Sequence, residues 1–322
     1  MEKPLLSICI PTYNRADCLR RALESIVDQD RFEEIEIVIS DNCSTDNTNE
    51  IGLHYSGRYR NIRYHRNARN LRDENFAIVL SLANGMLRKL SNDTLEYEPG
   101  AVSRMLDCVE NNLSTRPVIY FTNEDKLVKC IGSGGMFKCN NADEFLRMVG
   151  HKVTWIGSVA LWDEDCKDSS RCISAMRENA HTCLGQIPCV VEMIKEHGAA
   201  VVYGRQIMHS LKTKEKKNLS YGLYEVFYKN YLAFMEVYWK DGVLTEDTYL
   251  YLKKEIGINF FALWIPNLEV NKDKYTTNGE NLRELVKREY MREPYYKEYK
   301  LKLMKNSVWF RFLRIYHNVK RK

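Results

Sequence analysis

The first third of the chain alternates short apolar runs with longer windows of amphipathic helical spacing. Residues 5–10 and 35–39 are continuous stretches rich in Ile and Leu or Val, as expected of strands that are buried on both faces. Between them, Leu19, Leu23 and Ile26 recur at the spacing of one face of a helix. This alternation predicts an α/β fold with a mainly parallel sheet flanked by helices.

Runs of the same two kinds continue along the chain and define the expected elements. The expected strands are residues 5–10, 35–39, 62–65, 86–90, 118–121 and 199–203, and the expected helices are residues 17–27, 48–55, 75–83, 99–111 and 187–194.

The pattern changes twice and so suggests a domain organisation. It becomes less regular after about residue 125, and beyond the charged loop at residues 212–218 the chain reads as helical only. We therefore expect a catalytic domain at 1–211, with a nucleotide-binding half at 1–125 and an acceptor half at 126–211. Residues 212–322 are expected to form a helical C-terminal region, with windows at 221–239, 245–256, 281–292 and 296–316.

The net charge of +5 is concentrated at one end of the chain. Residues 300–322 hold eight Lys or Arg and no Asp or Glu, which leaves 40 basic and 43 acidic residues elsewhere. A body that is slightly acidic argues against a nucleic-acid-binding protein. No run approaches the roughly 18 apolar residues of a membrane-spanning helix, and residues 1–4 do not resemble a secretory leader, so we expect a cytoplasmic protein. The ten scattered cysteines lack a Cys-x-x-Cys pair and are expected to be reduced.

Polar clusters follow three of the expected strands at the points where they end. The first is Pro-Thr-Tyr-Asn-Arg at 11–15, the second runs from Ser40 to Asp46, and the third is Ser-Asn-Asp-Thr at 91–94. Ligands of open α/β sheets bind at the carboxyl ends of the strands. These clusters therefore predict one binding site with an aromatic face, a carboxylate and short oxygen-bearing side chains.

The ordered set of these clusters resembles glycosyltransferase family 2, the inverting transferases with the GT-A nucleotide-diphospho-sugar fold. Asn70-Leu71 followed by Asn75, the run Ala83-Asn84-Gly85 and the run Pro99-Gly100-Ala101 also occur in family order. The resemblance covers residues 5–106 well and the next hundred residues loosely. It implies a GT-A domain and the transfer of a sugar from a nucleotide-sugar to a hydroxyl group, as in bacterial surface polysaccharide assembly.

The resemblance also implies roles for the residues that follow the strands. Thr12 and Tyr13 would line the base pocket, and Asp41 would accept the base N–H, a contact that favours uracil or thymine. The expected donor is a UDP-sugar, with a dTDP-sugar as the less favoured alternative. Turn formation and helix capping are the alternative for Asp41 and Asp46, and core packing is the alternative for Tyr13. The full expected nucleotide site is Pro11, Thr12, Tyr13, Asn14, Asp41, Asn70, Asn92 and Asp93.

The metal-binding motif of the family is altered in this chain. Related enzymes hold a divalent cation with Asp-x-Asp after the fourth strand, whereas this chain has Asn92, Asp93 and Thr94 at that place. Neutral oxygens bind Mg²⁺ or Mn²⁺ less strongly than carboxylates do. We expect a weakened metal site that depends on the donor phosphates, with a structural turn as the alternative.

The expected catalytic base is missing as well. Gln186 occupies the position where the family places an aspartate, and an amide cannot accept the proton of the acceptor hydroxyl. The candidates nearby in sequence are Asp163 and its neighbours Glu164 and Asp165, together with Glu178 and His181, and we favour Asp163 or His181. Trp155 and Gly157 are expected to shape the acceptor pocket, with core packing as the alternative for Trp155.

The C-terminal tail combines apolar and basic residues at helical spacing. Leu301, Met304, Val308, Phe312 and Ile315 share one side of a helix, although Leu303 and Phe310 fall on the other side. Such a helix fits either an anionic membrane surface or a docked position on the body of the protein. Taken together, the sequence predicts an inverting glycosyltransferase acting on a glycan or lipid-linked acceptor. A family member that binds nucleotide or glycan without catalysis is the rival, and a nucleotidyltransferase is disfavoured because no Gly-rich loop follows the first strand.

Overall fold

The computed structural model describes residues 3–122, 135–211, 216–219 and 221–320. The chain divides into two compact units. The first comprises residues 1–145 and 153–212, and the second comprises residues 146–152 and 213–322. Each unit is described separately.

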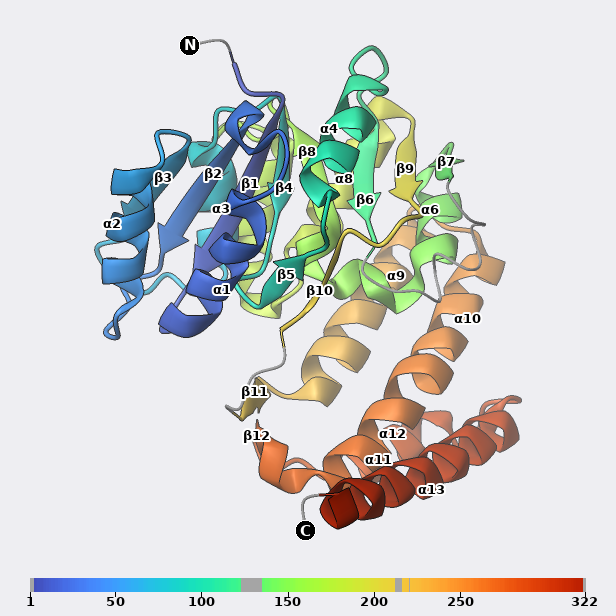
Figure 1. Cartoon of the computed structure of the whole chain (residues 1–322). Helices are drawn as coiled ribbons and strands as arrows, with labels where there is room; N and C mark the ends of the chain where they lie inside the picture. Colours follow the sequence, from blue (N-terminus) through green and yellow to red (C-terminus); the bar gives the residue numbers. More distant parts are fainter. Residues whose placement is uncertain (1–2, 123–134, 212–215, 220, 321–322) are drawn as a thin grey trace. The chain divides into compact units, whose positions relative to one another are not determined.

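The first unit is built on a mixed sheet of eight strands in the order β3-β2-β1-β4-β8-β6-β9-β7. Strands β1, β2, β3 and β4 run parallel to one another, whereas β8 is antiparallel to both β4 and β6. This mainly parallel sheet with helices packed on it confirms the expected α/β fold class (Figure 1). The strands are β1 (Leu6–Thr12), β2 (Ile35–Asp41), β3 (Ile62–Arg66), β4 (Leu87–Leu90), β6 (Val118–Phe121), β7 (Met136–Cys139), β8 (Val159–Trp162) and β9 (Ala200–Tyr203).

Helices cover both faces of the sheet because its strands are apolar on both faces. Alternate residues of a strand point to opposite faces. Ile8 and Ile10 of β1 share a core with Leu23 of α1 and Met105 of α4, whereas α3 packs on β1 and β2 from the other face. The helices of this unit are α1 (Ala16–Val27), α2 (Thr48–Arg58), α3 (Glu74–Leu82), α4 (Ala101–Glu110), α7 (Arg171–Glu178) and α8 (Gln186–His197), and α6 (Ala142–Val149) crosses the boundary of the units.

Several features differ from the sequence-based expectations. Strand β1 continues through Pro11, which pairs with Ser40, instead of ending there. Strand β8 inserts into the middle of the sheet, although residues 159–162 were not expected to form a strand. A disulfide joins Cys172 of α7 to Cys189 of α8, which corrects the expectation that all cysteines are reduced.

Gly85 precedes β4 at a point where the chain passes directly over β1. A Cβ atom on Gly85 would lie 2.6 Å from the backbone nitrogen of Ser7 and 2.9 Å from the carbonyl carbon of Leu6. Backbone cannot yield as a side chain can, so we expect Gly85→Ala to lower the free energy of unfolding by about 1–3 kcal/mol, measured by urea denaturation. Gly57 in α2 has no atom within 4 Å of the equivalent position. Gly57→Ala is the matched control and should raise stability by about 0.5 kcal/mol; an equal response of the two variants would contradict this account.

The second unit is mainly helical, as expected for the C-terminal region. A short parallel pair, β11 (Lys217–Leu219) and β12 (Tyr275–Thr277), interrupts the helices and was not anticipated. Within the described residues, no helix is both long and apolar enough to cross a membrane. The helices are α9 (Tyr231–Lys240), α10 (Glu246–Glu255), α11 (Ala262–Val270), α12 (Leu282–Tyr290) and α13 (Tyr296–Lys320), with π-helical segments at Glu225–Asn230 and Ile256–Phe261.

Candidate active site

The polar clusters after β1, β2 and β4 meet at one edge of the sheet, which we call the carboxyl edge. Strand β1 lies between β2 and β4, so their carboxyl ends are adjacent. The backbone N–H of Asn42 donates to the backbone carbonyl of Thr12 at 2.9 Å. The Thr12 hydroxyl donates to Asp93 Oδ2 at 2.8 Å. Three segments that are far apart in the sequence are therefore joined by direct hydrogen bonds.

Asn14 links the loop after β1 to the loop after β2. It adopts a left-handed backbone conformation (φ 51°), which asparagine tolerates better than most residues. Its side-chain oxygen accepts the Thr45 N–H at 2.7 Å, and its own N–H donates to the Ser44 hydroxyl at 2.8 Å. The neighbouring Tyr13 is 42% exposed and offers an aromatic ring at the carboxyl edge.

Asp41 ends β2 with a carboxylate that is fully buried. The Ser44 N–H donates to Oδ1 at 2.9 Å, while the Tyr64 hydroxyl and Arg66 Nη1 donate to Oδ2 at 2.7 and 3.0 Å. Burial, and then the hydrogen bond to Asp41, raise the pKa of Tyr64. Three protein donors thus already bind this buried carboxylate, and in this structure Asp41 orients Tyr64 and Arg66. Asp46 accepts the Thr48 N–H at 3.0 Å and the Ala16 N–H at 3.1 Å and thus caps the adjoining helices.

A buried network of asparagines brings the loop after β3 to the same edge. The side-chain Nδ2 of Asn42 donates to Asn70 Oδ1 at 2.9 Å. The side-chain Oδ1 of Asn42 accepts from Asn67 Nδ2 at 3.1 Å and from the backbone N–H of Leu71 at 2.8 Å. Asn75 at the start of α3 donates to the Ser40 carbonyl at 2.8 Å. The sequence drew attention to Asn70 and Asn75 but missed Asn67, whose role depends on contacts between distant segments.

Asp93 follows β4 and is held by two protein donors. Besides Thr12, Arg15 Nη1 donates to its Oδ1 at 3.1 Å. Burial raises the pKa of Asp93, and the charge of Arg15 and the Thr12 hydrogen bond act in the opposite direction. Asp93 is buried and both of its oxygens accept protein hydrogen bonds, while its neighbours Asn92 and Thr94 offer only neutral oxygens, so these residues do not fit a resident divalent cation. The described part of the chain also contains no cluster of three His, Cys, Asp or Glu suited to a metal. The expected metal site at Asn92, Asp93 and Thr94 is thus not formed by the protein alone.

Asp163 lies at the opposite edge of the sheet. Strand β8 is antiparallel to β4, so the residue after Trp162 lies at the amino end of β4, where the Asp163 N–H donates to the Met86 carbonyl at 2.8 Å. The extended chain from Met86 to Leu90 alone spans about 13 Å. Asp163 is also paired with Lys3 and Arg116. This placement corrects the expectation that Asp163 could act as a base at the carboxyl edge. Its neighbours are engaged as well: Glu164 pairs with Arg116, and Asp165 accepts from His197 Nε2 at 2.9 Å.

His181 belongs to the side of the unit that carries the carboxyl edge. It lies in the short 3₁₀ turn Ala180–Thr182, and the nearby Cys183 thiol is hydrogen-bonded to Asp73, just before α3. His181 is exposed, and its Nδ1 lies 3.0 Å from the Glu178 carbonyl oxygen. A carbonyl oxygen can only accept, so Nδ1 donates, and in the neutral imidazole the lone pair lies on Nε2.

Gln186 and Gly157 fix the segment expected to contact the acceptor. Gln186 is buried, and its Nε2 donates to the Thr154 carbonyl at 2.7 Å, so it fills a structural role. A Cβ atom on Gly157 would lie 2.8 Å from Leu95 Cδ1 and 3.6 Å from Asn92 Oδ1, so this segment approaches the turn after β4 closely. Trp155 is partly buried against the core, in line with the alternative given for it.

Lys89 is a buried amine that the sequence did not reveal. It lies in β4 with no exposed surface, and its Nζ donates to the Gly157 carbonyl at 2.8 Å, to the Leu90 carbonyl at 3.0 Å and to the Tyr97 hydroxyl at 3.2 Å. Burial lowers the pKa of Lys89 to about 7. Lys89 therefore ties the acceptor segment to β4 beneath the carboxyl edge.

Comparison with known proteins relates this site to one family. Residues 7–131 match the model described as glycosyl transferase family 2. The chain is 50% identical over 84 residues to the abequosyltransferase RfbV of Salmonella typhimurium, a quarter of each protein. It is 44% identical over 48 residues to a GalNAc(5)-diNAcBac-PP-undecaprenol beta-1,3-glucosyltransferase of Campylobacter jejuni, 15% of each. These matches span a quarter or less of the relatives' length.

The fold as a whole resembles solved structures at low sequence identity. The S. aureus protein TarS, residues 1–349 in complex with UDP-GlcNAc, aligns with 94% of this chain and 89% of its own at a TM-score of 0.57 and 15% identity. This likeness extends the fold relationship well beyond residue 131.

Proposed function

We propose that the chain is an inverting glycosyltransferase of family 2 that uses a UDP-sugar, on the basis of the match of residues 7–131 to the model of that family. Its acceptor would be a hydroxyl of a glycan or lipid-linked glycan in surface polysaccharide assembly. Both curated relatives named above are sugar transferases, and the name of one contains an undecaprenol diphosphate. The protein would work in the cytoplasm at the inner face of the membrane.

One observation supports this proposal above the others: the loops after β1, β2 and β4 join at the carboxyl edge through Thr12. This is the position at which open α/β sheets bind nucleotides. Tyr13 offers an exposed ring for base stacking, and Arg15, whose side chain is 45% exposed, offers positive charge beside Asp93. The structurally similar TarS was solved with UDP-GlcNAc, which is consistent with a uridine donor here.

The chemistry would be a direct displacement at the anomeric carbon. The acceptor oxygen forms the new bond while the bond to the diphosphate breaks, and a base takes the hydroxyl proton. We assign the base to His181, because it is exposed, because its Nδ1 donates to the Glu178 carbonyl and so leaves Nε2 of the neutral ring to accept a proton, and because Asp163 lies at the other edge. Arg15 would stabilise the negative charge of the departing diphosphate. Asp93 would hold Arg15 and Thr12 in place.

The proposal and its non-catalytic rival differ in turnover. We expect the purified chain to release UDP from a UDP-sugar faster than it releases dTDP or GDP from the corresponding donors. Asp93→Asn should weaken UDP binding about tenfold, since Arg15 loses its charged partner. Stabilisation by UDP in a thermal shift assay without release from any donor would support the binding protein, and the absence of both effects would reject the family function.

A divalent cation should bind only with nucleotide present. Asp93 is engaged by Arg15 and Thr12, so Asn92 and Thr94 alone offer few ligands, and donor phosphates would have to supply the rest. Calorimetric titration of Mn²⁺ should therefore give no measurable heat with the protein alone and saturable binding once UDP is added. Tight Mn²⁺ binding without UDP would contradict the geometry, and activity that persists unchanged in EDTA would show that no cation is needed.

A further inference from the structure

Helix α13 has two apolar sides, of which only one is covered by its own unit. Tyr299 and Leu303 are buried, and the Asn306 amide donates to the Ala262 carbonyl of α11 at 2.8 Å. On the other side lies a row of exposed apolar residues, which we call the outer stripe. Its members are between 51% and 69% exposed: Leu301, Met304, Val308, Phe312 and Ile315.

The presence of two apolar sides explains why the apolar residues of the tail do not all fall on one face of the helix. Leu303 is buried against the unit and Phe310 is half-buried, so the residues that interrupt the amphipathic pattern lie away from the outer stripe. The docked helix and the membrane-facing helix that the sequence presents as alternatives are thus compatible. One side of α13 packs on the unit, and the opposite side remains exposed.

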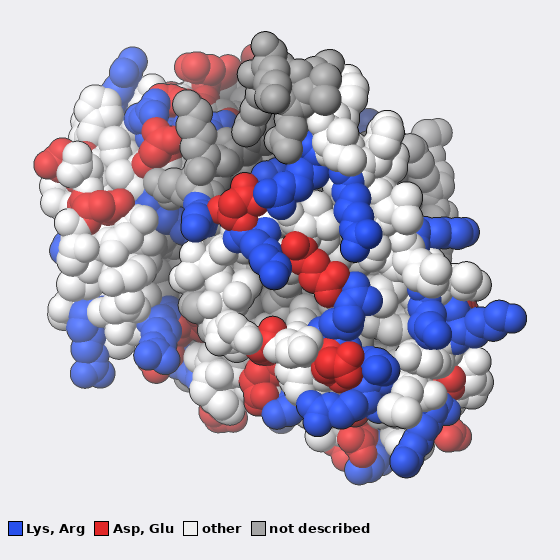
Figure 2. All heavy atoms as spheres, turned by 90° about the horizontal axis from the view of Figure 1, so that it is seen from below, with Lys and Arg blue, Asp and Glu red and all other residues white. Residues whose placement is uncertain are grey.

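Basic residues border the outer stripe. At 100° per residue, Lys300 and Arg311 lie along one border and Lys305 along the other. No acidic residue follows Glu298 in the sequence. Figure 2, seen from below, shows Lys and Arg side chains among Asp, Glu and uncharged ones. The combination of an apolar stripe with cationic borders is typical of helices that lie in the interface of an anionic bilayer.

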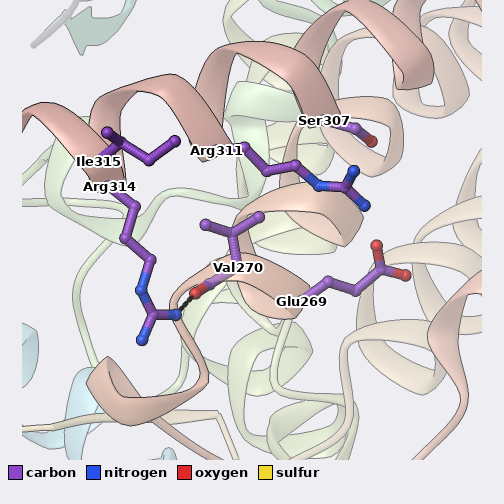
Figure 3. A pocket seen from close by; sticks show the side chains of 6 residues that line it. All are labelled: Glu269, Val270, Ser307, Arg311, Arg314 and Ile315. Atoms are coloured by element: carbon purple, nitrogen blue, oxygen red, sulfur yellow. Dashed lines mark hydrogen bonds between the residues drawn. The ribbon is translucent and has the colours of Figure 1, made fainter.

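A pocket of about 450 Å³ opens beside the stripe between α13 and α11. Arg311 extends into it, and within the described residues Arg311 makes no hydrogen bond or ion pair (Figure 3). Glu269 also lines the pocket, but Arg283 holds both of its carboxylate oxygens at 2.6 Å. Arg314 donates to the Val270 carbonyl at the opposite wall. Arg311 is therefore available for an anion that arrives next to the stripe.

We propose that the outer stripe docks on an anionic phospholipid bilayer and that Arg311 binds a lipid phosphate. The biological purpose of this membrane contact rests on the proposed lipid-linked acceptor. The binding of the outer stripe to a bilayer does not itself require sugar transfer. A second copy of the chain fits this surface less well. It would bring the stripe's cationic borders together with no carboxylate on residues 299–322 to pair with them.

Vesicle co-sedimentation of the full chain tests this inference. We expect binding to vesicles of phosphatidylcholine with about one quarter phosphatidylglycerol and little binding to phosphatidylcholine alone. Val308→Glu combined with Phe312→Glu should reduce the bound fraction at least about tenfold, because both charges enter the interface. Arg311→Gln should weaken binding roughly fivefold. Leu250→Glu is the control, since Leu250 is 50% exposed on α10 outside the stripe.

Each outcome decides the inference. Unchanged binding by the Val308 and Phe312 double variant, or failure of the parent chain to bind anionic vesicles, would overturn it. Loss of a dimer in light scattering without any change in vesicle binding would instead assign the stripe to self-association. UDP release should be the same in the double variant and the parent chain. Vesicle binding without UDP release would reject the proposed function, while the inference that the outer stripe binds a bilayer would still hold.

Discussion

Replacing His181 by glutamine should lower turnover by about 100-fold or more, because general base catalysis contributes roughly 10²- to 10⁴-fold. The Glu178 carbonyl accepts from Nδ1, so in the neutral imidazole the lone pair that can take a proton lies on Nε2. Glutamine is of similar length but cannot take a proton at neutral pH. The loss should appear in the rate of transfer to an acceptor, measured as UDP release in single-turnover experiments.

The affinity for UDP separates a catalytic role from a structural one. His181 is exposed, so His181→Gln should leave the dissociation constant for UDP and the thermal midpoint unchanged. His54→Gln on the exposed side of α2 is the matched control and should retain full turnover. Turnover of His181→Gln within about threefold of the parent would remove His181 from the mechanism. Glu178, at the end of α7, would then be the next candidate.

The carboxyl edge was predictable because its signals are local. An apolar run that stops at a polar cluster marks both a buried strand and the place where its carboxyl end meets the site, as the residues around Thr12 and Asp93 illustrate. Parallel strands place all such ends on one side of a sheet. The order of the first four strands therefore brought Thr12, Asp41 and Asp93 to one edge without any knowledge of distant contacts.

The direction of β8 was not predictable in the same way. Residues 159–162 are apolar whichever way the strand runs, so the sequence gives no indication that β8 is antiparallel to β4. That single reversal moves Asp163 to the opposite edge. The engagement of Asp93 by Arg15 is equally non-local, since it depends on how two loops fold against each other. Directions and partners of this kind are set by tertiary packing and leave no periodic signal in the sequence.

Lys89 should make the stability of the protein depend on pH in the alkaline range. Its ordinary pKa is 10.5, and burial lowers it to about 7 in the folded chain. Between these values the unfolded chain carries a proton that the folded chain lacks, so stability rises with pH. Below pH 7 Lys89 is protonated in both the folded and the unfolded chain, so the buried charge lowers the free energy of unfolding by its full amount. At about 1.36 kcal/mol per pKa unit, this destabilisation should decrease by about 3 kcal/mol between pH 7 and pH 9.5.

Lys89→Met isolates this effect because methionine fills a similar volume without a titrating group. The free energy of unfolding of the parent, minus that of Lys89→Met, should increase by about 3 kcal/mol over the same pH range in urea titrations. Subtracting the variant cancels the other groups that titrate there. Lys138→Met, on the exposed surface of β7, is the control and should show no such trend. A difference between the parent and Lys89→Met that stays constant from pH 7 to 9.5 would mean that Lys89 keeps its proton in the fold. The three hydrogen bonds to Gly157, Leu90 and Tyr97 would then outweigh the cost of burying the ammonium group.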